Sequence, residues 1–279
     1  MNALEFSARG RRWRADLRRP IDLAIPLDFA GAQPRFFAGT PASSAPLRAG
    51  SFTGSVGAGA SCNCATYTLA PHCHGTHTEC VGHVTDPAAS LAALTPVAPC
   101  LALLVSLRPR ALGPKAAGPY AGAEDRIIDR TALEQAAAAW LAEPWTAVVV
   151  RTLPNEIAKQ HRAYVDGGAP APYFEPSAMG WLVERGVTSL VVDLPSLDRA
   201  DDGGHLAAHR IYWGLPPGVT DVNVATRPHA LVTELAYVPD ETPDGLYLLD
   251  LHVPAFVADA APSRPVLYPL TEMDGPSSA

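Results

Sequence analysis

A cluster of potential metal ligands lies between residues 72 and 83 of the chain. This stretch reads His-Cys-His-Gly-Thr-His-Thr-Glu-Cys-Val-Gly-His and holds four of the nine histidines and two of the five cysteines. Imidazole, thiolate and carboxylate groups are the ligands that hold zinc and similar transition metals in proteins. The residue types alone therefore predict a metal site in this part of the chain.

The spacing within the cluster favours an extended backbone. The residues separated by even numbers are Cys73, His77, Glu79 and His83. An extended stretch would point all of them to one side, whereas a helix would turn Glu79 about 200° away from His77. The spacing is not that of a structural zinc module, which needs paired Cys-x-x-Cys or His-x-x-x-His ligands. We therefore expect a catalytic site whose remaining ligands come from elsewhere in the chain.

The alternative is that these residues have no ligand role. Cysteine is among the most buried residue types, and a lone histidine is usually a packing or surface residue. That interpretation needs several coincidences within twelve residues, and Gly75-Thr76 marks a backbone turn rather than a core strand.

Residues outside the cluster could complete the site. The other histidines are His161, His205, His209, His229 and His252. Glu234 is a further candidate because it lies in an apolar run, and a buried glutamate is costly unless it is paired or bound to a metal. An outward-facing glutamate on a half-exposed strand is the alternative interpretation.

Apolar runs and turn signals predict the elements that position these residues. Strands are expected at residues 21–25, 61–69, 100–107, 146–152, 187–194, 231–238 and 246–253, and helices at residues 131–142 and 176–185. Residues 29–60 are expected to be rich in loops, and Cys62 and Cys64 to be buried structural thiols. Strands outnumber helices and no linker interrupts the chain, so we predict one strand-rich α/β domain over residues 1–279.

Composition argues against several classes of function and location. The chain is 48% hydrophobic and 18% charged, as in a soluble globular protein. Its net charge of −7 and lack of a basic stripe argue against nucleic acid as a partner. The longest apolar stretch, residues 91–107, is too short for a membrane span and is broken by prolines. Five cysteines, two of them in the ligand cluster, oppose a disulfide framework, so we expect a cytoplasmic protein. The partner that we expect is a small-molecule substrate.

The sequence resembles the cyclase family of metal-dependent hydrolases, which includes bacterial kynurenine formamidase and isatin hydrolase. That family carries His-x-Gly-Thr-His-x-Asp-x-Pro-x-His, and residues 73–83 fit this frame with Cys73, Glu79 and Val81 as departures. Further similar segments lie at residues 21–23, 149–152, 190–198, 208–209 and 232–235. The resemblance implies a swivelling β/β/α fold, a centre of two zinc or manganese ions, and a homodimer or homotetramer.

The resemblance also implies roles for single residues. The implied metal ligands are Cys73, His77, Glu79, His209 and Glu234, with both glutamates bridging the two ions. His83 corresponds to the family's proton donor and acceptor. A thiolate at Cys73 would favour zinc over manganese. The alternative is that His72 or His74 replaces the missing histidine, although their even positions argue against it.

The resemblance implies hydrolysis of an amide, formamide, lactam or ester bond by metal-bound hydroxide. By family analogy the best named substrate is N-formylkynurenine, which would make the chain an arylformamidase of tryptophan catabolism. Phe36 and Phe37 would stack on an aromatic substrate or, alternatively, anchor their loop on the core. Three other functions stay open: a metal-binding protein without hydrolase activity, a polyketide cyclase-like enzyme, and catalysis by Cys73 as a nucleophile activated by His77 or His83.

Overall fold

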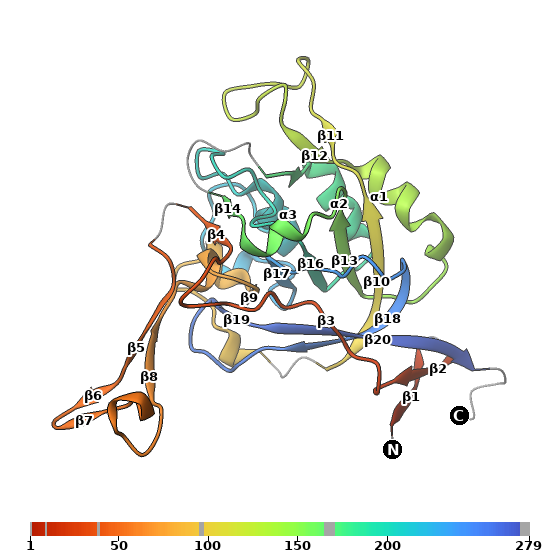
Figure 1. The fold of residues 1–279 in the computed structure, drawn as a ribbon. Coiled ribbons are helices and arrows are strands. Elements are labelled where there is room, and N and C mark those ends of the chain that lie inside the picture. Colours follow the sequence, from red (N-terminus) through yellow and green to blue (C-terminus); the bar gives the residue numbers. More distant parts are fainter. Residues whose placement is uncertain (1, 9, 38–39, 95–97, 165–170, 274–279) are drawn as a thin grey trace.

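A computed structural model of the chain describes residues 2–8, 10–37, 40–94, 98–164 and 171–273 (Figure 1). One large sheet of 11 strands organises the fold. Its strands are β1 (Ala3–Ala8), β2 (Arg11–Asp16), β3 (Ile21–Asp22), β9 (His77–Glu79), β10 (Cys100–Leu107), β13 (Ala147–Thr152), β16 (Ser189–Val192), β17 (Leu231–Glu234), β18 (Gly245–His252), β19 (Ala260–Pro262) and β20 (Arg264–Met273). They lie in the order β1-β2-β20-β18-β10-β13-β16-β17-β9-β19, and β3 pairs with β20.

The centre of the sheet is parallel and buried on both faces. Strands β10, β13, β16 and β17 run parallel, while β18 and β9 flank them in the antiparallel sense. Along β10, Leu101, Leu103 and Val105 pack into the larger hydrophobic core, and Ala102 and Leu104 pack into the second core on the opposite face. Burial on both faces explains why these strands read as continuous apolar runs.

Three α-helices contribute to the larger core: α1 (Arg130–Ala137), α2 (Pro176–Glu184) and α3 (Ala207–Trp213). The Asp129 side chain caps α1 by accepting a hydrogen bond from the backbone nitrogen of Ala132 at 2.8 Å. The helix expected at residues 131–142 therefore begins as predicted but changes to a 3₁₀ turn after Ala137. Gly214 caps the end of α3, and its φ of 67° lies in the left-handed region.

An arm projects from the body of the molecule (Figure 1). It consists of two short antiparallel ribbons, β5 (Ser43–Pro46) with β8 (Ala65–Thr68), and β6 (Arg48–Ala49) with β7 (Phe52–Thr53). The expectation of a loop-rich segment is therefore only partly right. Cys62 is exposed in the arm and Cys64 is half-buried, so the interpretation of both as buried structural thiols is wrong.

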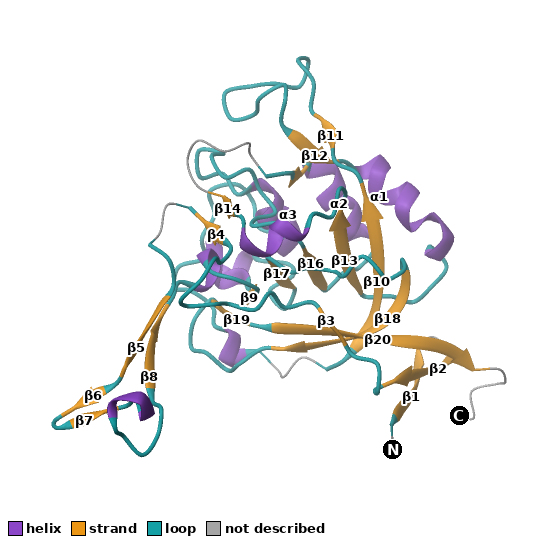
Figure 2. Cartoon of the chain, in the orientation of Figure 1, coloured by secondary structure: helices purple, strands orange, loops and turns teal. Residues whose placement is uncertain are grey.

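The remaining strands form small sheets: β11 (Arg110–Ala111), β12 (Arg126–Ile128) and β15 (Tyr173–Phe174) in one, and β4 (Arg35–Phe36) with β14 (Ala163–Tyr164) in another. The predicted strands at residues 100–107, 146–152, 187–194, 231–238 and 246–253 all contribute to the main sheet. The strand-rich α/β fold class is thus confirmed (Figure 2). In the part of the chain that the structure covers, no helix has the length and apolarity needed to cross a membrane.

Candidate metal centre

Two neighbouring strands bring three ligand-type side chains to one face of the sheet. In the antiparallel pair of β17 and β9, Glu234 lies opposite His77, and Val232 lies opposite Glu79. Residues directly opposite each other point to the same face. Val232 packs into the core beneath the helices, so His77, Glu79 and Glu234 all point to the helix side of the sheet.

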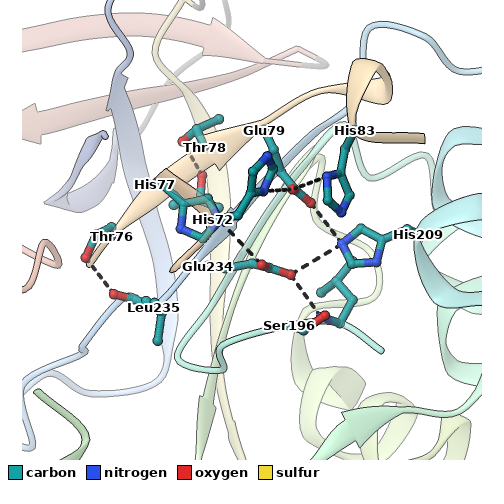
Figure 3. A network of polar contacts seen from close by, with 12 residues as sticks. His72, Thr76, His77, Thr78, Glu79, His83, Ser196, His209, Glu234 and Leu235 are labelled. Carbon is teal, nitrogen blue, oxygen red and sulfur yellow. Dashed lines mark hydrogen bonds and ion pairs between the residues drawn. The ribbon is translucent and has the colours of Figure 1, made fainter. Parts of the chain in front are cut away.

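The side-chain hydroxyl of Thr76 holds these two strands against each other. The Thr76 hydroxyl donates to the backbone carbonyl of Leu235 at 2.6 Å (Figure 3). It also accepts from the backbone nitrogen of Ile25 at 2.8 Å. Leu235 itself has a φ of 52°, so β17 ends abruptly after Glu234. The start of β9 is therefore held at the carboxyl end of β17, where ligands commonly bind in α/β sheets.

Helix α3 supplies a fourth ligand-type side chain, His209. Asp198, which follows β16, accepts hydrogen bonds from the backbone nitrogens of Ala208 and His209 at 2.7 and 3.1 Å, and from Nδ1 of His209 at 2.7 Å. Burial would raise the pKa of Asp198, but these hydrogen bonds lower it below its usual value. An ionised Asp198 thus fixes the protonated nitrogen of His209 and leaves Nε2 free to face the sheet.

The nitrogen and oxygen atoms of these residues converge. Nε2 of His209 lies 2.8 Å from Oε1 of Glu79 and 3.4 Å from Oε1 of Glu234, and Nε2 of His77 lies 3.5 Å from Oε2 of Glu234 (Figure 3). Nδ1 of His77 donates to the Gly75 carbonyl at 3.1 Å, so its Nε2 carries the lone pair. Oε1 of Glu234 accepts from the backbone nitrogen of Leu197 at 2.9 Å, which orients the carboxylate.

Four of the converging atoms are buried without a hydrogen-bond partner among the described residues. They are Nε2 of His77, Nε2 of His209, and both carboxylate oxygens of Glu79. Although Glu79 and His209 approach to 2.8 Å, the contact lacks hydrogen-bond geometry, as expected for atoms that aim at a common point. Buried acceptors that face one another are costly unless a cation lies between them. The donor set therefore fits a divalent metal ion.

The pKa values of His209 and Glu79 also indicate that the cluster favours a positive charge. Burial lowers the pKa of His209, but the surrounding carboxylates outweigh burial and raise this pKa well above its usual value. Burial likewise raises the pKa of Glu79, and the neighbouring His83 and His209 lower it well below the usual range. The cluster therefore stabilises a positive charge at its centre.

A cavity of about 430 Å³ opens beside the cluster. His83 lines it, with Nδ1 at 3.8 Å from Oε2 of Glu79, together with His209 and Glu234. Phe36 and Phe37 line it as well, with their ring centroids 4.2 Å apart; Phe36 is buried and Phe37 is exposed. The cavity thus connects the candidate metal centre with two aromatic rings.

The structure brings most of the predicted site residues together: His77, Glu79, His83, His209 and Glu234. Cys73 lies in the 3₁₀ turn Pro71–Cys73 and His83 in the 3₁₀ turn Val81–Val84, so the extended stretch spans only His77–Glu79. The prediction of one extended face is therefore wrong for residues 73 and 83. Burial raises the pKa of the Cys73 thiol. The assignment of Cys73 as a ligand stays a prediction, as do the separate roles of the other residues.

Three groups of described residues have side-chain atoms close enough to hold an ion. The groups are His72 with His83 and Asp259, His72 with His77 and Glu79, and Glu79 with His83 and His209. Sequence reasoning did not single out Asp198 or Asp259. Asp198 had a signal, because it follows a buried strand within the similar segment of residues 190–198, whereas nothing in the sequence marked Asp259.

Comparisons with known proteins agree with this picture. The profile of the family described as Putative cyclase matches residues 21–199, well over half of the chain. No curated protein matches the sequence. Among solved structures, a predicted metal-dependent hydrolase from Bacillus stearothermophilus is 13% identical with a TM-score of 0.54, over 90% of this chain and 98% of the other.

Two further structures show the same fold. A protein described as a novel cyclase is 14% identical with a TM-score of 0.57, over 89% of this chain and 86% of the other. An isatin hydrolase bound to the product analogue thioisatinate is also 14% identical, with a TM-score of 0.51 over 91% and 93%. These likenesses confirm the swivelling β/β/α fold, and the profile match shows that the chain belongs to the cyclase family.

Proposed function

We propose that the chain is a metal-dependent hydrolase that cleaves an amide, formamide, lactam or ester bond. The observation that carries this proposal is the convergence, at the edge of a cavity, of four buried atoms that have no hydrogen-bond partner among the described residues. The names of the structural relatives, metal-dependent hydrolase and isatin hydrolase, support the same reaction class. Within that class, N-formylkynurenine is the specific candidate substrate, which would make the chain an arylformamidase.

In this proposal the metal is a pair of zinc or manganese ions. The residues that would hold them include His77, Glu79, His209 and Glu234. When bound, a divalent ion supplies Lewis acidity and lowers the pKa of water to about 7. Glu79 and Glu234 each turn both carboxylate oxygens toward histidines, so each could supply two oxygen ligands. The remaining steps belong to side chains around the cavity.

His83 is placed to move protons. It is half-buried on the cavity wall, and Nδ1 lies 3.8 Å from Oε2 of Glu79, next to the position of the metal ligands. Imidazole exchanges protons near neutral pH. His83 would take the proton from the attacking water and return it to the leaving nitrogen or oxygen, a transfer that contributes roughly 10²–10⁴-fold to rate.

The cavity favours a small substrate with an aromatic ring. Its volume of about 430 Å³ lies within the range of small-molecule sites. The exposed ring of Phe37 can stack on a planar substrate, while the buried ring of Phe36 packs beside it. A scissile carbonyl beside the metal ligands would place an attached aryl group toward these rings.

Assays with a panel of substrates test the proposal. Purified protein is incubated with N-formylkynurenine, isatin and simple aryl esters, with added zinc or manganese and after treatment with a chelator. We expect hydrolysis of at least one substrate, its loss with the chelator, and its recovery on metal addition. Metal binding without turnover of any substrate would contradict the proposal and favour a non-catalytic metal-binding protein.

Alkylation with iodoacetamide distinguishes the metal mechanism from catalysis by a cysteine nucleophile. Cysteine catalysis needs a base within hydrogen-bonding distance of the thiol. Among the described residues, the Cys73 sulfur belongs to none of the groups of closely spaced ligand-type atoms that contain His77 or His83. We therefore expect iodoacetamide to leave the activity unchanged, whereas inactivation by iodoacetamide together with indifference to chelators would overturn the metal mechanism.

A further inference from the structure

We propose that His72, through Nδ1, takes the ligand position that the family frame gives to Cys73, and that Asp259 is the residue that positions it. This inference rests on the proposed metal centre. It concerns which atoms hold the ion, and it can fail while the hydrolase proposal stands. Asp259 lies beyond the residues matched by the family profile.

The first observation is the place of the His72 ring. Its Nδ1 lies 2.9 Å from Oε2 of Glu79, and its ring centroid lies 5.3 Å from that of His77 (Figure 3). His72, His77 and Glu79 form one of the groups whose ligand atoms all lie within 4.8 Å of one another. The 3₁₀ turn that ends at Cys73 thus directs the side chain of His72 into the centre.

The second observation is the protonation pattern that Asp259 imposes. Nε2 of His72 forms a hydrogen bond of 2.8 Å with Oδ2 of Asp259. A carboxylate can only accept, so Nε2 carries the hydrogen and Nδ1 of a neutral ring presents its lone pair to Glu79. Oε2 of Glu79 has no hydrogen-bond partner among the described residues. Two lone pairs that face each other at 2.9 Å need a positive charge, either a proton on Nδ1 or a metal ion that takes its place.

The third observation is that three histidines share one arrangement. Nδ1 of His209 donates to Asp198 and Nδ1 of His77 donates to the Gly75 carbonyl, just as Nε2 of His72 donates to Asp259. In each ring the second nitrogen faces the centre. Histidines that bind metals typically donate their other N–H to a carboxylate or carbonyl, which fixes the tautomer and the orientation of the ring.

Asp259 is itself fixed in place. Its backbone carbonyl accepts from the backbone nitrogen of Cys80 at 3.0 Å, which ties the segment before β19 to the end of β9. Its carboxylate also lies 3.6 Å from Nδ1 of His83. The side chain therefore reaches both histidines that line the cavity from this side.

The two rival ligands are less suited. The Cys73 sulfur belongs to none of the three candidate groups found in the described part of the chain. In His74, Nε2 donates to the Thr40 carbonyl at 2.9 Å and Nδ1 accepts from the backbone nitrogen of Ala70 at 3.0 Å, so both ring nitrogens are engaged. With His72 as ligand, the protein donates two negative charges instead of three, and a thiolate no longer favours zinc over manganese.

Cobalt binding distinguishes His72 from Cys73. Purified, metal-free protein is titrated with Co²⁺ and its near-ultraviolet absorption is recorded for wild type, Cys73→Ser, His72→Ala and a control, His252→Ala. His252 forms a similar pair with Asp250 on β18 but does not belong to the centre. We expect no thiolate-to-cobalt charge-transfer band in wild type, unchanged Co²⁺ affinity in Cys73→Ser and in the control, and lost or weakened binding of one ion in His72→Ala.

A charge-transfer band that disappears in Cys73→Ser would overturn the inference. Because His72→Ala could fail to fold, circular dichroism is recorded for every variant, and the wild-type spectrum together with Asp259 variants decides the question independently. We expect Asp259→Ala to weaken Co²⁺ binding roughly 10–100-fold, the usual effect of losing such a partner, with partial rescue by Asp259→Asn because its amide oxygen still accepts. Unchanged affinity in a folded Asp259→Ala protein would also overturn it.

The cobalt titrations do not measure hydrolysis, so the ligand assignment and the proposed function can fail separately. If the cobalt results agree but no substrate is hydrolysed, only the proposed function fails. If a thiolate band appears while hydrolysis is observed, only the assignment of His72 fails.

Discussion

The two buried imidazoles of the centre, His77 and His209, are oriented by different partners to the same effect. A backbone carbonyl holds one ring and the carboxylate of Asp198 holds the other, so each ring turns Nε2 toward the glutamates. Neither the Gly75 carbonyl nor the Asp198 carboxylate is itself a proposed metal ligand, so the centre depends on residues beyond its ligands. Substitutions of ligands, of orienting residues and of the proton-transferring residue should therefore have different effects on metal binding and on turnover.

Replacing His77 and His83 separates metal binding from proton transfer. We expect His77→Ala to lose metal and activity together, because its Nε2 is buried and has no hydrogen-bond partner in the described part of the chain. His83→Ala should keep its metal and lose turnover by roughly 10²–10⁴-fold. Metal analysis by mass spectrometry alongside rate measurements checks both, and equal loss of metal in the two variants would show that His83 is a ligand.

Asp198 has a measurable orienting role. Asp198→Ala removes the acceptor of Nδ1 of His209 and two backbone hydrogen bonds at the start of α3. We expect metal affinity to fall roughly 10–100-fold, since partners of this kind fix the ligand tautomer. Isothermal titration with zinc measures the change, and Asp198→Asn, which retains an acceptor oxygen, should lose less. Equal affinity in Asp198→Ala and wild type would contradict this role.

At the scale of elements, the register between β9 and β17 places the site. Apolar runs predicted the buried strands well, because burial on both faces leaves a clear signal in the sequence. The 3₁₀ turn at Pro71–Cys73 could not be predicted, since it depends on contacts with β9 and β19 rather than on a local pattern. That turn decides which of two adjacent residues, His72 or Cys73, faces the centre.

The arm shows a second limit of sequence reasoning. Of its four strands, the sequence predicted only β8, within residues 61–69. The other three strands, β5, β6 and β7, have four, two and two residues, which is too short for a pattern of alternating apolar and polar residues to mark them. Asp259 was missed for a related reason: it approaches His72 only because β19 pairs with β9. Contacts between segments this far apart in the chain follow from topology rather than from any local pattern.

The hydroxyl of Thr76 should hold β9 and β17 together. In Thr76→Val, the buried carbonyl of Leu235 and the buried backbone nitrogen of Ile25 lose their partner without a change in side-chain volume. Leaving such groups unsatisfied costs about 1–3 kcal/mol each. Urea unfolding should show a lower free energy of unfolding for Thr76→Val, whereas Thr68→Val on the exposed β8 should change it by less than about 0.5 kcal/mol. Similar values for the two variants would refute the proposed role of Thr76.

At the scale of the whole molecule, the centre joins parts of the chain that are far apart in sequence. Its ligand-type residues come from β9, α3 and β17, and the segment before β19 adds Asp259. An ion bound to the ligands from β9, α3 and β17 would cross-link the folded state and not the unfolded chain. The homodimer or homotetramer expected from the family resemblance stays a prediction at this scale.

Metal binding should therefore stabilise the whole fold. We expect chelation to lower the melting temperature of the wild type, and added zinc to restore it, because a ligand at 100 times its Kd stabilises the native state by about 2.7 kcal/mol. Differential scanning fluorimetry measures this shift. The melting temperature of His77→Ala should respond less to zinc, and an equal response in both proteins would place the bound ion elsewhere.

Diffraction from crystals of the purified protein, measured on both sides of the zinc absorption edge, tests the central claim most directly. The account predicts an anomalous peak at bonding distance, about 2.0–2.2 Å, from Nε2 of His77, Nε2 of His209 and a carboxylate oxygen of Glu79 or Glu234. A zinc-soaked crystal with no peak between these atoms, or with its strongest peak at a different site, would contradict it.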